Sequence, residues 1–214
     1  MVKQPERAGR RGRPIGDREA KRAELLQAAT AVIAEEGYAG ASLRKVAQRA
    51  GYTTGAVTYY FANKEEMVTA LVESRFDRYD AMLEAARERT EIPELIRGWL
   101  AMTTSDSHHW PVMSELLVHA RSEPALAELI RQRYAQYRET HASIIKAAQA
   151  GGTIRDDIPA ELLGDQLAAM ADGWTMMYPF EPDRFTRPRA QALVDAAIEL
   201  IAPLPASSAS ADDA

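Results

Sequence analysis

The segment between residues 42 and 60 constrains the fold of this chain most, because small, turn-forming and apolar residues recur there at fixed offsets. Ala47 has a side chain small enough for two helices to pack closely around it. Gly51 follows four residues later, where a sharp turn needs the positive φ that glycine adopts at little cost. Val57 comes six residues after Gly51 and can fill the gap between the helices. These offsets predict two short helices that meet at about 90–120°, a helix-turn-helix.

Capping residues delimit these two short helices. Ser42 precedes a helix expected over residues 43–50, and Thr53 precedes a second helix expected over residues 54–60. The second helix of such a pair lies in the major groove of DNA, where its side chains contact base edges. The segment therefore predicts a DNA-binding module.

The rest of the chain also favours helices. It is 46% hydrophobic and has only 12 glycines among 214 residues. We expect an all-α fold of about nine helices, with three in an N-terminal head and six in a larger body. A fourth helix, capped by Asn63 and continuing to about Arg87, would link the head to the body. The expected domain limits are a disordered basic arm over 1–16, a DNA-binding head over 17–63, a helical body over 64–202 and a disordered tail over 203–214.

Charge is distributed unevenly along the chain. Residues 1–64 contain 12 Lys and Arg against 6 Asp and Glu, whereas residues 65–214 contain 14 against 25. The basic end is also the end that carries the helix-turn-helix. We therefore expect the head to meet the polyanionic backbone of DNA, and the acidic body to have another role.

Other features exclude several classes of protein. The chain has no cysteine, which rules out disulfides and cysteine-based metal sites. No apolar run approaches the ~20 residues of a membrane span, and the basic N-terminus lacks the apolar stretch of a secretory signal. We expect a cytoplasmic protein without a membrane partner.

Nine residues are candidates for contact with DNA. Thr54 and Thr58 can hydrogen-bond base edges or touch thymine methyl groups, and Tyr59 can reach a base or a phosphate. Arg44 can bind phosphates together with the amides at the start of its helix, and Lys64 would be a further phosphate contact. The alternative for each polar residue is an ordinary solvated position. The candidates are Arg13, Ser42, Arg44, Thr53, Thr54, Gly55, Thr58, Tyr59 and Lys64.

The basic arm supports two interpretations. Its Arg11–Pro14 stretch is similar to the core of an AT-hook, which inserts arginine into a narrow, A·T-rich minor groove. The other interpretation is a flexible tail that adds only non-specific attraction. Both predict DNA binding that weakens steeply as salt is raised.

The motifs of the head resemble those of the tetracycline-repressor (TetR) family of bacterial transcriptional regulators. The specific match covers about Arg22 to Leu71, and the region from Gln166 to Ile201 weakly resembles the betaine-regulator type of C-terminal domain. In one departure, Thr58 stands where the family usually has a tyrosine, so this chain lacks a ring that commonly contacts the phosphate backbone in the family. The matching segments are Ser42–Ala47, Ala50–Gly51, Gly55–Phe61 and Asn63–Lys64.

The resemblance implies that the body binds a small-molecule effector in a lining of aromatic and thioether side chains. Methionine adapts its shape, and tryptophan or tyrosine can add a polar contact or a cation–π face. The alternative is that these side chains form ordinary core, since such stripes at helical spacing usually do. The candidates for ligand binding are Trp99, Met102, Trp110, Met113, His119, Tyr137, His141, Met170, Trp174 and Met177.

Two helices near the C-terminus are expected to form a four-helix interface between subunits. Ala169 and Gly173 are small enough for a partner helix to approach closely. A dimer also suits a single short recognition helix, because two copies can read a near-palindrome, and the family resemblance implies the same assembly. The alternative is plain core. The candidates are Leu162, Gln166, Ala169, Gly173, Met176, Val194, Ala197, Ile198 and Ile201.

The leading hypothesis is a homodimeric, ligand-responsive repressor that binds a double-stranded DNA operator and is released by a largely apolar or aromatic effector. One alternative is an activator or an effector-independent DNA-binding dimer. Another is an α-helical enzyme or ligand carrier with an incidental helix-turn-helix. The chain has no HExxH, GxSxG, P-loop or GxGxxG motif, so we expect no catalytic residue, no cofactor and no metal.

Overall fold

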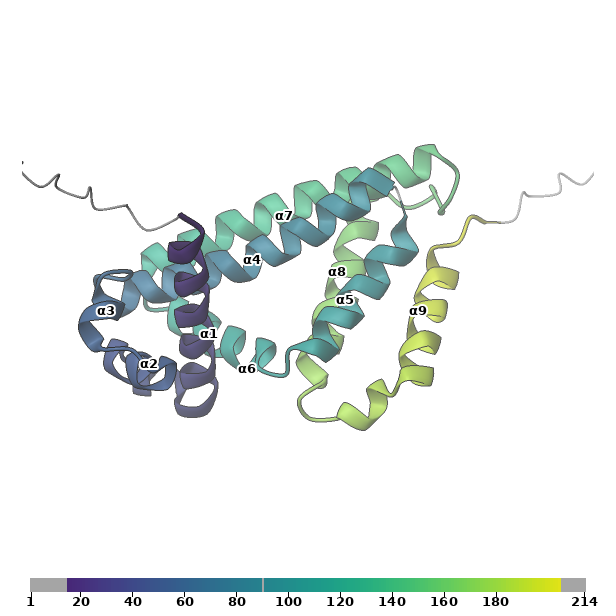
Figure 1. Cartoon of the computed structure of the whole chain (residues 1–214). Coiled ribbons are helices and arrows are strands. Elements are labelled where there is room, and N and C mark those ends of the chain that lie inside the picture. Colours follow the sequence, from purple (N-terminus) through teal and green to yellow (C-terminus); the bar gives the residue numbers. More distant parts are fainter. Residues whose placement is uncertain (1–14, 90, 205–214) are drawn as a thin grey trace, which may run out of the picture. The chain divides into compact units, whose positions relative to one another are not determined.

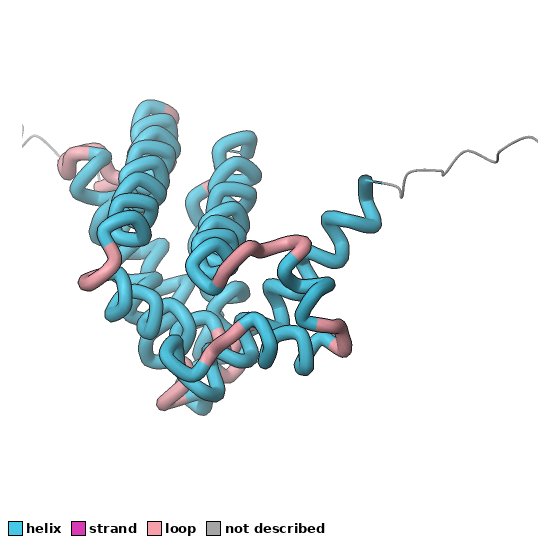
Figure 2. Tube along the Cα trace, turned by 90° about the vertical axis from the view of Figure 1, so that its left-hand side faces the viewer, coloured by secondary structure: helices cyan, strands magenta, loops and turns pink. Residues whose placement is uncertain are grey.

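The computed structural model describes residues 15–89 and 91–204, which form nine α-helices and one short 3₁₀ helix, without strands (Figure 1). Short loops join these helices, as a second view of the trace shows (Figure 2). The prediction of an all-α fold of about nine helices is confirmed. The helices are α1 (Ile15–Gly40), α2 (Leu43–Ala50), α3 (Thr54–Thr58), α4 (Lys64–Arg89), α5 (Ile92–Ser105), α6 (His109–Ala120), α7 (Pro124–Ala150), α8 (Ala160–Met177), η1 (Pro182–Phe185) and α9 (Arg187–Ile201).

The described residues divide into two compact units between Val68 and Thr69. The division falls inside α4, so this one helix contributes to both units. The functional limits of 17–63 for the head and 64–202 for the body stay a prediction. Most of the expected arm and tail lies outside the described residues.

The first helix is longer than its sequence suggested. It begins at Ile15 rather than at Asp17, and it continues beyond Glu36 to Gly40. Gly37 interrupts the helical geometry with φ 71° and ψ 169°. Glycine adopts this backbone conformation without the steric penalty of a side chain, which explains why the helical geometry is interrupted at Gly37. One more turn after Gly37 then leads into α2.

Apolar side chains of α1, α2 and α3 form the core of the head. Val46 and Ala47 of α2 and Val57 of α3 are buried, as the spacing of the helix-turn-helix requires. At the surface, Arg49 Nη2 donates to Glu35 Oε1 of α1 at 2.7 Å. Solvent screens this exposed pair, so apolar burial contributes more to the stability of the head. The buried residues of α1 are Leu25, Leu26, Ala28, Ala29, Val32 and Ile33.

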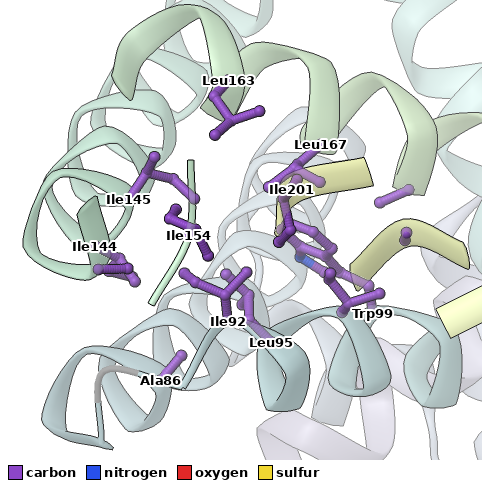
Figure 3. Packing of buried hydrophobic residues seen from close by; sticks show 14 of the residues in the cluster. Ala86, Ile92, Leu95, Trp99, Ile144, Ile145, Ile154, Leu163, Leu167 and Ile201 are labelled. Atoms are coloured by element: carbon purple, nitrogen blue, oxygen red, sulfur yellow. The ribbon is translucent and has the colours of Figure 1, made fainter. Parts of the chain in front are cut away.

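The body has a separate hydrophobic core between α4, α5, α7, α8 and α9 (Figure 3). Trp99 is its largest side chain. A backbone hydrogen bond borders this core: the Arg155 amide donates to the Ile201 carbonyl at 2.8 Å, which ties the loop after α7 to the end of α9. Labelled members of this core are Ala86, Ile92, Leu95, Trp99, Ile144, Ile145, Ile154, Leu163, Leu167 and Ile201.

The position of α9 corrects one expectation. Val194, Ala197 and Ile201 were expected at a subunit interface, but each is only 2% exposed within the single chain. Ile198 also packs partly buried against the same core. Helical spacing of apolar residues identifies a face that is buried, but it does not tell core from interface. The inward face of α9 therefore belongs to the protomer itself.

Candidate nucleic-acid interface and effector cavity

The turn between α2 and α3 depends on two caps and one glycine. Ser42 Oγ accepts from the Lys45 amide at 3.3 Å, which caps α2. Thr53 Oγ1 accepts from the Ala56 amide at 3.2 Å, which caps α3. Between them Gly51 has φ 71° and ψ 25°. Both caps provide acceptors for amides in the first turns of the helices, and the Ala56 amide also donates to the Thr53 carbonyl at 3.0 Å. All of these contacts join residues that are close in the sequence.

Gly51→Ala should lower the free energy of unfolding by about 1 kcal/mol, because a residue with a side chain is disfavoured in the left-handed region. A Cβ atom at this position would meet nothing within 4 Å, so the loss would come from the backbone rather than from a clash. Thermal denaturation measures the effect. The control is Gly55→Ala in α3, where φ is helical and no loss is expected; equal stability of wild type and Gly51→Ala would contradict the argument.

The recognition helix presents a small, polar surface. Thr54, Gly55 and Thr58 are exposed, and Tyr59, which follows directly after α3, is 68% exposed. The Thr58 hydroxyl donates to the Gly55 carbonyl at 3.1 Å, so its oxygen remains available only as an acceptor toward DNA. The helix ends at Thr58, two residues earlier than expected, and this places Tyr59 at its C-terminus.

The candidate DNA contacts on α2 and α4 differ in how far their side chains are already engaged within the protein. Arg44 is exposed and Ser42 is half-buried, with its hydroxyl engaged as a cap. Lys64 donates to the Tyr38 carbonyl, and its Nζ lies 3.9 Å from the centroid of the Tyr38 ring. Partial burial lowers the pKa of Lys64. The Lys64 ammonium is therefore already bound to Tyr38 near the end of α1, and a DNA phosphate could bind it only in addition to this contact. Arg13 lies outside the described residues.

A groove that the sequence did not reveal lies beside the recognition helix. It has a volume of about 590 Å³, and its walls come from α1 and from the turn and end of the helix-turn-helix. The Arg18 guanidinium lies 5.7 Å from the Tyr59 ring, and Lys21 Nζ lies 6.0 Å from the Tyr52 ring. Arg18 and Lys21 are one turn apart in the basic segment, and that spacing was the signal available in the sequence.

The body contains a small cavity with a polar side. Its volume is about 20 Å³, close to the space of one water molecule. Thr103 Oγ1 of α5 and Thr175 Oγ1 of α8 are 2.8 Å apart at its wall. The lining comes from α4, α5, the start of α6, α7 and α8. The lining residues are Arg78, Tyr79, Trp99, Met102, Thr103, Asp106, His109, Tyr137, Ala171, Asp172 and Thr175.

A buried ion pair organises one wall of this cavity. Arg75, which is 5% exposed, pairs with Asp106, and Arg78 Nη1 lies 3.1 Å from Asp106 Oδ2. Burial alone would raise the pKa of Asp106, but the two guanidinium groups lower it below its ordinary value. The carboxylate is therefore ionised at neutral pH, and its charge is balanced within the wall.

His109 is held in one tautomer by this wall. Arg75 Nη1 lies 3.2 Å from His109 Nδ1, and Tyr79 Oη lies 2.7 Å from His109 Nε2. Because a guanidinium can only donate, Nδ1 accepts and Nε2 carries the ring proton, which it donates to Tyr79. Burial and the charge of Arg75 lower the pKa of His109 to about 4, so the ring is neutral.

His141 lies in the apolar side of the body. Its ring is perpendicular to that of Trp99, with centroids 5.0 Å apart, and burial lowers its pKa to about 4. Among the described residues none hydrogen-bonds to His141 Nε2. His141 is therefore a neutral ring that packs edge-to-face against Trp99.

Three of the expected ligand-binding residues line the cavity, namely Trp99, Met102 and Tyr137. His141 does not line the cavity itself, but its ring packs against Trp99, which does. Among the polar residues of the wall that the sequence did not single out, Arg78 and Tyr79 belong to α4, which was expected only as a linker, and Asp106 belongs to the loop after α5. The others lie on α5, α6 and α8 and are Thr103, His109, Asp172 and Thr175. The expected residues that do not line the cavity are Trp110, Met113, His119, Met170, Trp174 and Met177.

The outer face of α8 remains apolar and open. Leu162 is 57% exposed and Met176 is 41% exposed, and Gln166 and Ala169 between them are exposed as well. A Cβ atom on Gly173 would meet nothing within 4 Å. The five expected interface residues on this helix thus form one accessible stripe, which we call the α8 stripe. In the part of the chain that the structure describes, no helix has the length and apolar composition needed to cross a bilayer.

Comparisons with known proteins agree with this architecture. The family model described as bacterial regulatory proteins of the tetR family matches residues 25–71, and the one described as the C-terminal part of BetI-type transcriptional repressors matches residues 86–203. The chain belongs to the TetR family. This regulator is 31% identical over 166 residues to the HTH-type transcriptional repressor SCO4008 of Streptomyces coelicolor, covering 76% of this chain and 82% of that protein.

Solved structures of other regulators share the fold of this TetR-family chain. The fatty acid degradation regulator FadR of Bacillus halodurans superposes with a TM-score of 0.70 at 20% identity, covering 84% of this chain and 93% of FadR. SmeT in complex with triclosan superposes with a TM-score of 0.68 at 20% identity, covering 86% of this chain and 92% of SmeT. At this identity the likeness concerns the fold.

Membership of the family decides the class of function. The chain is a helix-turn-helix transcriptional regulator, and the alternative of an α-helical enzyme is set aside because members of this family are regulators. Family members bind DNA and small-molecule effectors and act as dimers.

Proposed function

We propose that this regulator is a dimeric repressor that binds a near-palindromic operator and leaves it when a small effector occupies the body cavity. The observation that carries the proposal is the capped helix-turn-helix with Tyr59 exposed at the end of α3. Because its work is on DNA, we place this activity in the cytoplasm.

In this proposal the head binds DNA with α3 in the major groove. The small side chains of Thr54 and Gly55 let α3 approach the base edges, where Thr58 offers an acceptor. Arg44 contacts a phosphate from α2. Arg18 and Lys21 add positive charge along the groove beside Tyr59, which suits a sugar–phosphate strand.

Tyr59→Ala should lower affinity for the operator about tenfold or more, since a contact of this kind is worth about 1–3 kcal/mol. The ring is exposed, so the melting temperature should remain that of wild type. Fluorescence anisotropy with DNA from upstream of the chain's own gene measures the affinity.

Two matched variants sharpen this experiment. Val118→Ala removes a side chain of equal exposure, 68%, from the body and should leave the affinity unchanged. Tyr59→Phe keeps the ring and tests the hydroxyl alone. If Tyr59→Ala binds the operator as tightly as Val118→Ala, the recognition surface has been misplaced.

The α8 stripe supports the dimer. Leu162 and Met176 are exposed apolar side chains, and Ala169 and Gly173 between them leave room for a partner helix. Two heads in such a dimer would reach successive major grooves about 34–36 Å apart and so read a near-palindrome.

The effector site is proposed at the body cavity because aromatic rings, a methionine and polar groups converge there. The triclosan bound to SmeT supports a small aromatic molecule as the kind of effector. The cavity is lined in part by Arg78 and Tyr79 of α4, and α4 begins at Lys64 directly after the helix-turn-helix. A shift of α4 on binding would reposition the head, provided the effector binds the two states with different affinity.

A further inference from the structure

The groove beside the recognition helix is large enough for a small molecule, whereas the cavity of the body is not. Its volume of about 590 Å³ falls in the range of about 300–1,000 Å³ that is typical of ligand sites, and the body cavity has about 20 Å³. Every residue that lines the groove belongs to the first compact unit of the chain. The head therefore has a ligand-sized space of its own, at the surface proposed to meet DNA.

Aromatic rings supply much of the lining of this groove. Tyr52, Tyr59 and Tyr60 all line it, and the rings of Tyr59 and Tyr60 are 5.1 Å apart and nearly perpendicular. Leu25 of α1 and Ala56 of α3 add apolar surface. Such a lining favours a flat aromatic molecule for two reasons. Binding removes apolar surface from water, and stacked or edge-to-face contacts between rings are favourable in themselves.

The charges that line the groove are positive. Of the described residues that line it, Arg18 and Lys21 are basic and none is acidic. Arg18 is exposed, its guanidinium lies 5.7 Å from the centroid of the Tyr59 ring, and it forms no ion pair with any described residue. A guanidinium that covers a ring with its face keeps N–H donors at its edge, where a carboxylate or sulfonate can accept from two of them.

Two carboxylates stand near the groove without lining it. Asp17 Oδ1 lies 3.9 Å from Lys21 Nζ, so the charge of this lysine is partly balanced within the protein. Glu24 Oε2 accepts from the Tyr52 hydroxyl at 2.6 Å, which restrains that ring. The positive charge that remains for an anion is therefore that of Arg18, next to the exposed ring of Tyr59.

We propose that the head groove is a second ligand site of this regulator, which binds a planar aromatic anion with its ring against the tyrosines and its charge at Arg18. An occupant of this site excludes DNA directly, because Ala56 and Tyr59 line the groove and also belong to the recognition surface. This competition rests on the proposed function, which takes that surface as the one that meets the operator. The ligand site itself does not depend on it.

A matched pair of probes tests the preference for an anion. The anion 2-naphthoate and the neutral 2-naphthamide have nearly the same shape. Equilibrium dialysis against the full-length chain should show 2-naphthoate binding about fivefold tighter, since Arg18 is exposed and water weakens its attraction for an anion.

The variant Arg18→Gln identifies the group responsible. It should lower affinity for 2-naphthoate about fivefold and leave that for 2-naphthamide within about twofold. Arg22→Gln is the control, because Arg22 is exposed on the same helix and lies 5.5 Å from the Phe61 ring, outside the groove. Both probes should bind Arg22→Gln as they bind wild type. Both positions are exposed, so both variants should keep the melting temperature of wild type.

Operator competition separates this site from the body cavity. An occupant of the groove excludes DNA, so the apparent Kd for the operator should rise without limit as 2-naphthoate is added. A molecule that acts from the body changes that Kd by at most the factor set by the coupling free energy, so its effect reaches a plateau. Fluorescence anisotropy measures the Kd, and equal concentrations of sodium acetate control for ionic strength, to which DNA binding is sensitive.

The outcomes distinguish the inference from the proposed function. Absence of 2-naphthoate binding, equal binding of the two probes, a preference that survives in Arg18→Gln, an equal loss in Arg22→Gln, or an operator Kd that stays constant or reaches a plateau would overturn the inference. Each of these leaves the proposed repressor intact. If 2-naphthoate binds through Arg18 but the chain binds no operator, the proposed function fails and the ligand site stands.

Discussion

Gly173→Arg should convert the dimer into monomers and lower affinity for the operator about 100-fold or more, because the two heads would no longer bind as one unit. The substitution introduces length and charge at the centre of the α8 stripe. A Cβ atom at this position meets nothing within 4 Å, so the protomer itself should fold normally. Light scattering coupled to gel filtration measures the mass, and anisotropy measures operator affinity at matched concentrations.

Two controls isolate the interface. Gly173→Ala adds one methyl group and should remain dimeric. Ala85→Arg places the same charge on an exposed position of α4, away from α8, and should leave mass and affinity unchanged. If Gly173→Arg stays dimeric with wild-type affinity, subunits meet through another exposed apolar region, such as that around Phe180 or Leu200.

Asp106→Ala should lower the free energy of unfolding by about 3 kcal/mol, because it removes the carboxylate partner of the buried Arg75 guanidinium. The same change removes the acceptor of the His108 amide, which lies 3.2 Å from Asp106 Oδ1 at the start of α6. Urea denaturation at a fixed protein concentration measures the loss.

The matched comparison is Arg78→Ala. Arg78 shares Asp106 with Arg75, but its side chain is 46% exposed, against 6% for Arg75. Its loss should change the free energy of unfolding by well under 1 kcal/mol. Similar losses in Asp106→Ala and Arg78→Ala would show that burial of Arg75 is not what makes the ion pair important.

The helix-turn-helix could be predicted because its determinants are local. Caps at Ser42 and Thr53, the positive φ of Gly51 and the buried position of Val57 all follow from a few neighbouring residues. The end of α3 was less predictable. The apolar pattern of the sequence continues through Tyr59 and so predicted a longer helix, but the helix stops at Thr58 and Tyr59 is exposed.

The cavity and the role of α9 could not be predicted because they depend on tertiary packing. His108 and His109 are adjacent and chemically identical, yet the structure exposes the first and buries the second against Arg75 and Tyr79. Val194 and Met176 look equally suited to an interface in the sequence, but only Met176 is exposed. Periodicity gives the apolar face of a helix and leaves open what covers it.

The single chain separates its two kinds of recognition along the sequence. Every candidate DNA contact falls within residues 13–64, whereas the wall of the cavity is built from residues 78–175, and no residue serves both. Under the proposed function, substitutions at Met102 or Asp172 should therefore change which effector is bound without changing which operator is bound. This separation makes the protein a practical starting point for a genetically encoded biosensor, in which the reporter stays constant while the analyte is changed.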